Sequence, residues 1–255
     1  MITTGELYSY FDKRIPRELS CEWDNDGLMV CADSSHEIKK VLFALDVTDE
    51  VVSYAIKGGY DLIISHHPLI FSPLKAINTE NPVCARALRL ICAGIAVFSF
   101  HTRLDALEGG VNDILAATLG LENIRSFGPA GEEMGRIGEL PEAMAEEDFT
   151  ALIKERVSRH ITGHFAGGKI RAVAVLGGSG RDFIHAARDA GADVFLCGEA
   201  GYHAVLDAPS LGMGIVEAGH YETERGVGAF FAEAFSKDFP KIKFEIYPHG
   251  NSFVH

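Results

Sequence analysis

Cysteine is scarce in this sequence: five residues among 255, an odd number, with no Cys-x-x-Cys pair. Such a set argues against a disulfide framework and against a structural zinc knuckle. We expect the thiols to be buried or idle, as free cysteines usually are, in a cytoplasmic protein.

Basic residues and long apolar runs are scarce as well. Lys and Arg number 23 against 36 Asp and Glu, and the formal charge of −13 repels nucleic-acid phosphates and anionic lipids. The longest apolar stretch, Leu88 to Phe100, is interrupted by Arg89, Gly94 and Ser99 and falls short of the roughly 18 residues of a membrane span. The first residues lack the basic and then apolar layout of a signal peptide. We therefore expect no membrane association, and nucleic acid is disfavoured as a partner.

Buried strands alternate with helices in the first half of the chain, which predicts an α/β fold with a largely parallel sheet. The expected strands are Lys40–Leu45, Asp61–Ser65 and Ile95–Phe100, and the expected helices are Leu7–Ile15, Thr48–Lys57 and Asn81–Ala93.

The second half of the chain repeats the first. Residues 171–176, 181–190 and 191–196 match a strand, a helix and a strand of the first half at an offset of 132 residues. The strand at 213–216 matches 94–97 at an offset of 119. This pattern predicts two internally duplicated α/β halves whose corresponding strand ends lie near one pseudo-two-fold axis. The best candidate boundary is the Gly-, Glu- and Ala-rich segment 128–147, followed by a helix at about 147–158.

Histidines directly follow the expected strands. Two of them are adjacent and can point to opposite sides, and two others each have a carboxylate four residues later, at one helical turn. Nitrogen and oxygen ligands of this kind suit Zn, Mn, Fe or Ni. The residues are the pair His66 and His67, then His101 with Asp105, and His220 with Glu224.

Each of these residues also has a purely structural interpretation. His101 and His220 could be hydrogen-bonded core histidines, and Asp105 and Glu224 could favour a helix dipole in a first turn. Taken together, four histidines and two carboxylates at one sheet edge without a cation would leave unpaired charge costing several kcal/mol. The combination therefore predicts a metal site.

Two further segments lie at strand ends. The turn Gly177–Gly180 could cradle a phosphate through its N–H groups, but it lacks the ending of a P-loop, and a tight turn without ligand is the preferred interpretation. Glu199 or His203, after the strand that corresponds to the His66–His67 strand, could relay protons or contact substrate.

These motifs resemble the NIF-three-like family, also called GTP cyclohydrolase 1 type 2 homologues. They run in family order over nearly the whole chain. The matching pieces are Trp23-Asp24-Asn25-x-Gly27-Leu28, Ser65-His66-His67-Pro68, His101-Thr102-x-Leu104-Asp105, Gly177-Gly178-Ser179-Gly180, Gly198-Glu199 and Gly219-His220-Tyr221-x-Thr223-Glu224.

The resemblance implies a fold and an assembly. Each subunit would contain two interlinked α/β domains, here residues 1–126 with about 230–255, and about 127–229. The subunits would form a homohexameric ring, with two divalent cations per subunit bound inside its cavity.

The resemblance also implies a ligand set. His66 and His220 would hold one ion, His67 and Asp105 the other, and Glu224 would bridge the two. His101 is not a direct ligand in the family pattern, so His101 and Glu199 are the candidate catalytic groups that move protons.

The chain departs from the family at two places. Met29-Val30-Cys31 stands where the family usually has a Val-Gly pair, and Arg103 stands where it has Asn. Arg103 could change which anion the cleft accepts. Arg103, Arg225 and Lys75 are the candidates for contact with a triphosphate.

The leading functional hypothesis is a metal-dependent hydrolase acting on a purine nucleotide, with opening of the GTP imidazole ring as the form the resemblance suggests. The alternative is a non-enzymatic metal-handling or regulatory ring protein, in which the ions are cargo or structural. A third hypothesis, a single-strand nucleic-acid binder, is disfavoured by the charge of −13.

Overall fold

The computed structural model describes residues 1–248 and divides the chain into two compact units. The first unit comprises Met1–Leu104 together with the chain from Gly228 onward, and the second comprises Asp105–Val227. The expected first domain ran to residue 126 and resumed at about 230; its last part, 249–255, lies outside the described residues. The two units are interlinked in sequence because the first is built from both ends of the chain.

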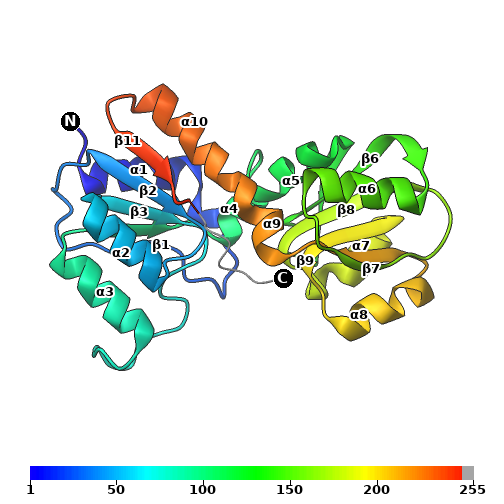
Figure 1. Cartoon of the computed structure of the whole chain (residues 1–255), viewed down its shortest axis with the longest axis horizontal. Helices are drawn as coiled ribbons and strands as arrows, with labels where there is room; N and C mark the ends of the chain where they lie inside the picture. Colours follow the sequence, from blue (N-terminus) through cyan, green and yellow to red (C-terminus); the bar gives the residue numbers. More distant parts are fainter. Residues whose placement is uncertain (249–255) are drawn as a thin grey trace. The chain divides into compact units, whose positions relative to one another are not determined.

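The first unit contains a five-stranded sheet in the order β1-β4-β3-β2-β11 (Figure 1). The ladders from β4 to β11 are parallel and β1 is antiparallel to β4. The strands are β1 (Gly27–Val30), β2 (Lys40–Ala44), β3 (Leu62–Ser65), β4 (Ala96–Ser99) and β11 (Lys243–Ile246). The three central strands were expected from the sequence; the two edge strands were not.

Helices cover both faces of this sheet (Figure 1). They are α1 (Thr4–Arg14), α2 (Asp49–Gly58), α3 (Pro82–Cys92) and α10 (Gly228–Asp238), with a 3-10 turn at Arg17–Leu19. Leu42 packs with buried residues of α2 and α3. The neighbouring Phe43 stacks on Phe231 of α10, which in turn contacts Phe11 of α1. Successive residues of β2 therefore serve opposite cores, as the twofold alternation of a strand requires.

The helix starts follow from capping side chains that the sequence displays. Thr3 and Glu6 form a capping box at α1. Thr48 accepts a hydrogen bond from the third residue of α2, and Asn81 does so at α3, where Pro82 takes the first helical position.

The second unit contains a six-stranded sheet in the order β5-β6-β8-β9-β10-β7. Only β8, β9 and β10 are parallel; β5, β6 and β7 are antiparallel to their neighbours, so the expectation of a largely parallel sheet fails in this unit. The strands are β5 (Glu122–Phe127), β6 (Gly135–Met144), β7 (Thr162–His164), β8 (Ile170–Ser179), β9 (Val194–Glu199) and β10 (Gly214–Glu217).

The helices of the second unit are short. They are α5 (Val111–Leu119), α6 (Glu146–Arg156), α7 (Ile184–Asp189), α8 (Tyr202–Asp207) and α9 (His220–Glu224), with 3-10 turns at Arg181–Phe183, Ala208–Leu211 and Arg225–Val227; α4 (Thr102–Ala106) crosses from the first unit to the second. Leu115 and Leu119 of α5 share a core with Phe149 of α6 and with Val173 and Leu196 of the sheet. This packing places α5 in the second unit, although we expected residues up to 126 in the first.

The strand registers carry the internal duplication. Val41 pairs with Leu62 in the first unit, and Val173 pairs with Val194 in the second, so both partners are 132 residues further along. The next ladder pairs Leu62 with Ala96 and Val194 with Gly214, an offset of 118 in the second strand. The expected offset of 119 is therefore wrong by one residue for this strand.

The extra residue of the second copy lies between its strand and its histidine. His101 follows the end of β4 by two residues, whereas His220 follows the end of β10 by three. Gly219, with φ of +92°, occupies a backbone conformation that other residues rarely adopt, and it begins α9. The offset of 119 holds again at the two histidines because this glycine turn lengthens the second connection.

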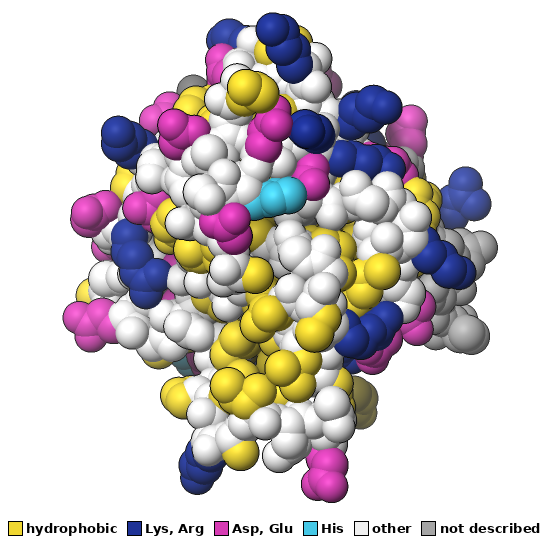
Figure 2. Space-filling view, turned by 90° about the vertical axis from the view of Figure 1, so that its left-hand side faces the viewer, with side chains coloured by type: hydrophobic (Ala, Val, Ile, Leu, Met, Phe, Trp, Pro, Cys, Tyr) yellow, Lys and Arg dark blue, Asp and Glu magenta, His cyan; other side chains and the backbone are white. Residues whose placement is uncertain are grey.

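The surface of the described residues agrees with the composition. Lys and Arg side chains are scattered among Asp and Glu on the face shown in Figure 2, where apolar side chains gather in the lower half. Among residues 1–248, none of the helices has the length and apolar character needed to cross a membrane.

Candidate metal centre

Three histidines of the first unit lie together at the carboxyl end of its sheet. His66 and His67 follow β3 and His101 follows β4, and these neighbouring parallel strands end in register at Ser65 and Ser99. The ring centroids of His66 and His67 are 5.3 and 5.7 Å from that of His101. One nitrogen of each ring lies within 4.8 Å of those of the other two, close enough to hold one metal ion.

Each of these histidines is oriented by a hydrogen bond from Nδ1. A carbonyl or carboxylate oxygen can only accept, so Nδ1 carries the proton in each ring and Nε2 carries the lone pair. Metal-binding histidines are held in this manner by partners outside the coordination shell. At 2.9 Å in each case, the acceptors are the main-chain oxygen of Phe100 for His66, Asp46 for His67 and Asp24 for His101.

The cluster is shielded on one side and open on the other. His66 is fully buried, whereas the side chains of His67 and His101 are 24% and 19% exposed. A solvated ion could therefore reach Nε2 of His67 or His101, and a substrate could approach from the same side. His101 has the same anchoring as the two predicted ligands, so its side chain suits either a metal ligand or a proton-moving group.

Asp24 has a second role beside holding His101. Its other oxygen accepts hydrogen bonds from the Thr102 hydroxyl at 2.6 Å and the Thr102 amide at 3.0 Å. Burial raises the pKa of Asp24, but the hydrogen bond and charge of His101 and the two bonds from Thr102 outweigh it and lower the pKa to about 2. The carboxylate is therefore ionised at any physiological pH.

We expect the variant Asp24→Asn to lose a pH-dependent part of the stability. The pKa falls from 3.8 to about 2 on folding, so the ionised carboxylate stabilises the fold by about 2 kcal/mol above pH 4, and this is lost as pH falls through about 2. Urea unfolding at about pH 6 and about pH 3 measures it: the parent protein should lose about 1 kcal/mol more than the variant between the two. Equal losses would contradict the lowered pKa.

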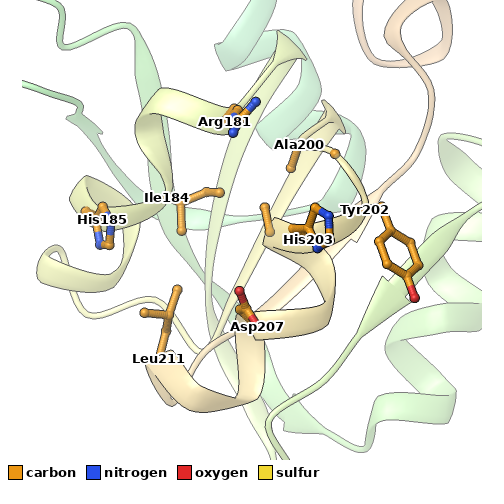
Figure 3. A pocket seen from close by; sticks show the side chains of 10 residues that line it. Arg181, Ile184, His185, Ala200, Tyr202, His203, Asp207 and Leu211 are labelled. Atoms are coloured by element: carbon orange, nitrogen blue, oxygen red, sulfur yellow. The ribbon is translucent and has the colours of Figure 1, made fainter.

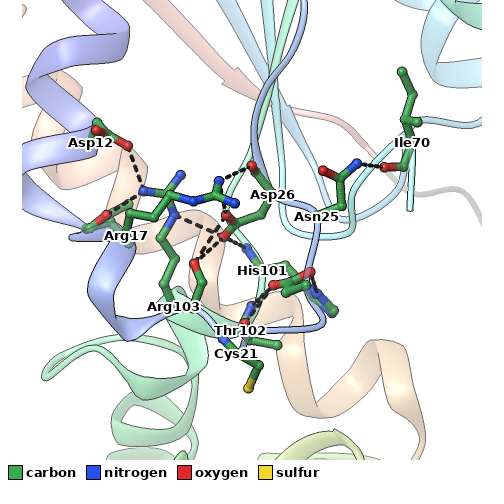
Figure 4. Close-up of polar contacts among 12 residues, drawn as sticks. Asp12, Arg17, Cys21, Asn25, Asp26, Ile70, His101, Thr102 and Arg103 are labelled. Atoms are coloured by element: carbon green, nitrogen blue, oxygen red, sulfur yellow. Dashed lines mark hydrogen bonds and ion pairs between the residues drawn. The ribbon is translucent and has the colours of Figure 1, made fainter. Parts of the chain in front are cut away.

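Arg103 proves to be a structural residue and not an anion contact. Its guanidinium is fully buried; Nε donates to Asp26 at 2.9 Å, and Nη1 donates to Asp12 at 2.7 Å and to the main-chain oxygen of Ile15 at 2.9 Å (Figure 4). Our expectation that Arg103 tunes anion binding is wrong, because these partners keep its charge away from any ligand.

The other two basic candidates lie at the surface. Arg225 forms an ion pair with Glu222 at 2.9 Å and donates to the main-chain oxygen of Val157. Lys75 is exposed in the segment between β3 and α3.

In the second unit, His220 lies between two carboxylates. Nε2 of His220 is 3.3 Å from Oε1 of Glu224, one turn later in α9, and Nδ1 is 3.3 Å from Oε1 of Glu199 at the end of β9. Glu224 is almost fully buried, whereas Glu199 is exposed. Glu199 thus has the position relative to His220 that Asp24 and Asp46 have relative to the histidines of the first unit.

The glycine turn after β8 lies directly against this pair. A Cβ at Gly178 would be 2.5 Å from Oε1 of Glu224 and 3.0 Å from Nε2 of His220, so a side chain there would displace both groups. The amides of Gly177 and Gly178 donate to Asn112 and to the Thr223 hydroxyl. Those N–H groups are engaged within the protein, as expected for a tight turn and unlike a phosphate cradle.

Asp105 and His203 complete the set of sequence candidates. Asp105 is buried in α4, and its main-chain oxygen accepts a hydrogen bond from Asn112. His203 projects from α8 into a shallow hollow of about 420 Å³, which Arg181 and Tyr202 also line (Figure 3). Glu199 is not among the residues that line this hollow.

The sequence interpretation missed the two anchoring carboxylates, Asp24 and Asp46. Asp24 belongs to an Asp- and Asn-rich loop that the sequence displays, so loop composition was the available signal. Asp46 follows β2, the strand beside β3, and its place one strand away from His67 was the corresponding signal.

Comparison with known proteins gives consistent matches. A family model described as Duf34/NIF3 (NGG1p interacting factor 3) matches residues 2–250. The chain is 36% identical over 227 residues to the GTP cyclohydrolase 1 type 2 homolog of Clostridium perfringens, with 86% of each chain covered. It is 35% identical over 215 residues to the homolog of the same name from Lactococcus lactis, with 83% of each covered. The solved structure of a Bacillus cereus protein related to NIF3 matches with a TM-score of 0.85 at 27% identity, covering 99% of both chains.

Proposed function

Because the chain belongs to the Duf34/NIF3 family, whose matched relatives are named GTP cyclohydrolase 1 type 2 homologs, we propose that it is a divalent-metal-dependent hydrolase of purine nucleotides. The observation that carries the metal-binding part is the trio of histidines in the first unit, each with Nδ1 anchored and Nε2 left as the basic nitrogen. The nucleotide part rests on the names of the relatives.

The proposed ligand set is the one implied by the sequence resemblance: two divalent ions held by His66, His67, Asp105, His220 and Glu224. The first unit contributes the adjacent histidines and the second contributes the other three residues. That both sets hold the same ions is a proposal based on the resemblance. Its support within the second unit is that His220 and Glu224 already lie 3.3 Å apart.

Divalent ions at these residues would supply an activated water near neutral pH and positive charge beside the reacting atoms. His101 is positioned to take or give a proton through Nε2, because Asp24 fixes its ring and stabilises its charged form. Glu199, exposed and next to Nδ1 of His220, is the second candidate for proton transfer. Assembly into a homohexameric ring and a cytoplasmic location belong to the same proposal and rest on the resemblance and the composition.

A turnover assay tests this proposal. Protein loaded with Zn or Mn and incubated with GTP is expected to consume it, chelation to stop consumption, and reloading to restore it; ATP and GMP serve as comparison substrates. Chromatography follows the nucleotide, and mass spectrometry counts the metal. Bound metal without turnover of any nucleotide would favour the metal-handling alternative. Turnover that survives complete removal of metal would contradict the metal-dependent mechanism.

A further inference from the structure

Two large aromatic side chains of the first unit stay half exposed beside the histidine cluster. Trp23 and Phe71 are 54% and 51% exposed, and their ring centroids are 6.2 Å apart. Each also contacts the ring of His101, at 6.3 Å from Trp23 and 6.2 Å from Phe71. The three rings form a continuous aromatic wall, defined here as Trp23, Phe71 and His101.

The loops that carry the wall are fixed in place. The side-chain amide of Asn25 donates to the main-chain oxygen of Ile70 at 2.5 Å, which ties the Trp23 loop to the residue before Phe71 (Figure 4). The amide of Cys21, at the start of the same loop, donates to the Thr102 hydroxyl at 3.0 Å. The exposed rings are therefore preorganised, and a ligand that docks on them has little ordering cost to overcome.

The charge around the wall selects the kind of ligand. The carboxylates of Asp24 and Asp46 bind His101 and His67 at its edge, and the side chain of Asp46 is 46% exposed. An anion placed against the ring faces would meet these negative charges, whereas an uncharged planar ring would meet aromatic faces alone. Bases stack on exposed aromatic side chains irrespective of sequence because every base has a π face.

We propose that Trp23 and Phe71 form a stacking platform for a planar heteroaromatic base, with the edge of the base toward His101. The inference deepens the proposed function, on which it rests for the expectation of a nucleotide substrate. It assigns base recognition to this wall and leaves the phosphates to groups elsewhere.

The test uses the fact that Trp23 is the only tryptophan of the chain. Metal-free protein is titrated with guanosine while tryptophan emission is recorded, with free N-acetyltryptophanamide as the reference for light absorbed by the base. Saturable quenching is expected, and ribose 5-phosphate, which has no base, should leave the emission unchanged. Phe71→Ala should weaken guanosine binding about 5- to 100-fold. Tyr202→Ala, which removes a 75% exposed ring in the second unit, is the matched control and should bind like the parent.

Calorimetry extends the test to Trp23 itself, whose variants cannot be followed by emission. Trp23→Phe should retain binding and Trp23→Ala should lose it. Absence of saturable quenching, equal quenching by ribose 5-phosphate, or emission that changes on dilution but not with guanosine would overturn the proposal; the last would show that a second copy covers the wall. Quenching without GTP turnover would leave the platform standing and remove the hydrolase, and turnover without quenching would do the reverse.

Discussion

Replacement of Arg103 by methionine is expected to lower the free energy of unfolding by about 3–5 kcal/mol, the usual cost of removing one partner from a buried ion pair. The side chains of Arg103 and Asp26 are both fully buried, and Nε lies 2.9 Å from the carboxylate. Burial lowers the pKa of Arg103, but Asp12 and Asp26 outweigh it and raise the pKa above its ordinary value, so the guanidinium stays charged. Without it, Asp26 would keep a buried charge whose main compensation is gone.

Arg17 offers a matched control for this prediction. Its guanidinium also contacts Asp26, at 3.3 Å, but its side chain is 54% exposed, and exposed pairs contribute only about 0–1 kcal/mol. Denaturant unfolding of Arg103→Met, Arg17→Met and the double variant Arg103→Met with Asp26→Leu measures the difference. The double variant should recover part of the loss because no buried charge remains. Equal losses in Arg103→Met and Arg17→Met would contradict a structural role specific to Arg103.

The central strands and the histidines were predictable from the sequence because they depend on local pattern. A buried strand followed by a histidine places that histidine at the carboxyl edge of a parallel sheet, and neighbouring strands then bring such residues together. The offset of 132 residues predicted the register of the second unit, since Val173 pairs with Val194 as Val41 pairs with Leu62.

The residues that escaped prediction act over long sequence distances. Asp24 lies 77 residues from His101, and Asp46 lies 21 from His67, so no local spacing links either pair. The assignment of Arg103 to anion binding failed for the same reason: its partner Asp12 is 91 residues away. The strands β1 and β11 join a sheet whose core strands are elsewhere in the chain, and α5 follows its packing on β8 rather than its neighbours in sequence.

Replacing His66 by alanine is expected to lower metal affinity by more than the 10–100-fold typical of losing a partner outside the coordination shell. His66 is fully buried with Nδ1 held by the carbonyl of Phe100, so no other side chain can take the place of its Nε2. Glu224→Gln should have a comparable effect, because in the proposed ligand set that carboxylate neutralises two ions at once. Metal retained after dialysis, counted by mass spectrometry, is the measurement, with circular dichroism to confirm folding.

His101→Ala separates the two roles that the geometry of His101 permits. If His101 acts beside the ions, the variant should retain metal with at most a 10–100-fold loss of affinity, and Asp24→Asn should resemble it because Asp24 orients the same ring. His203→Ala, which removes an exposed histidine of α8, is the control and should retain metal like the parent. Should His101→Ala empty the site while Glu224→Gln stays loaded, the roles implied by the family resemblance are reversed. The anchored trio of His66, His67 and His101 would then be the better guide to the ligands, since Nδ1 is held alike in all three.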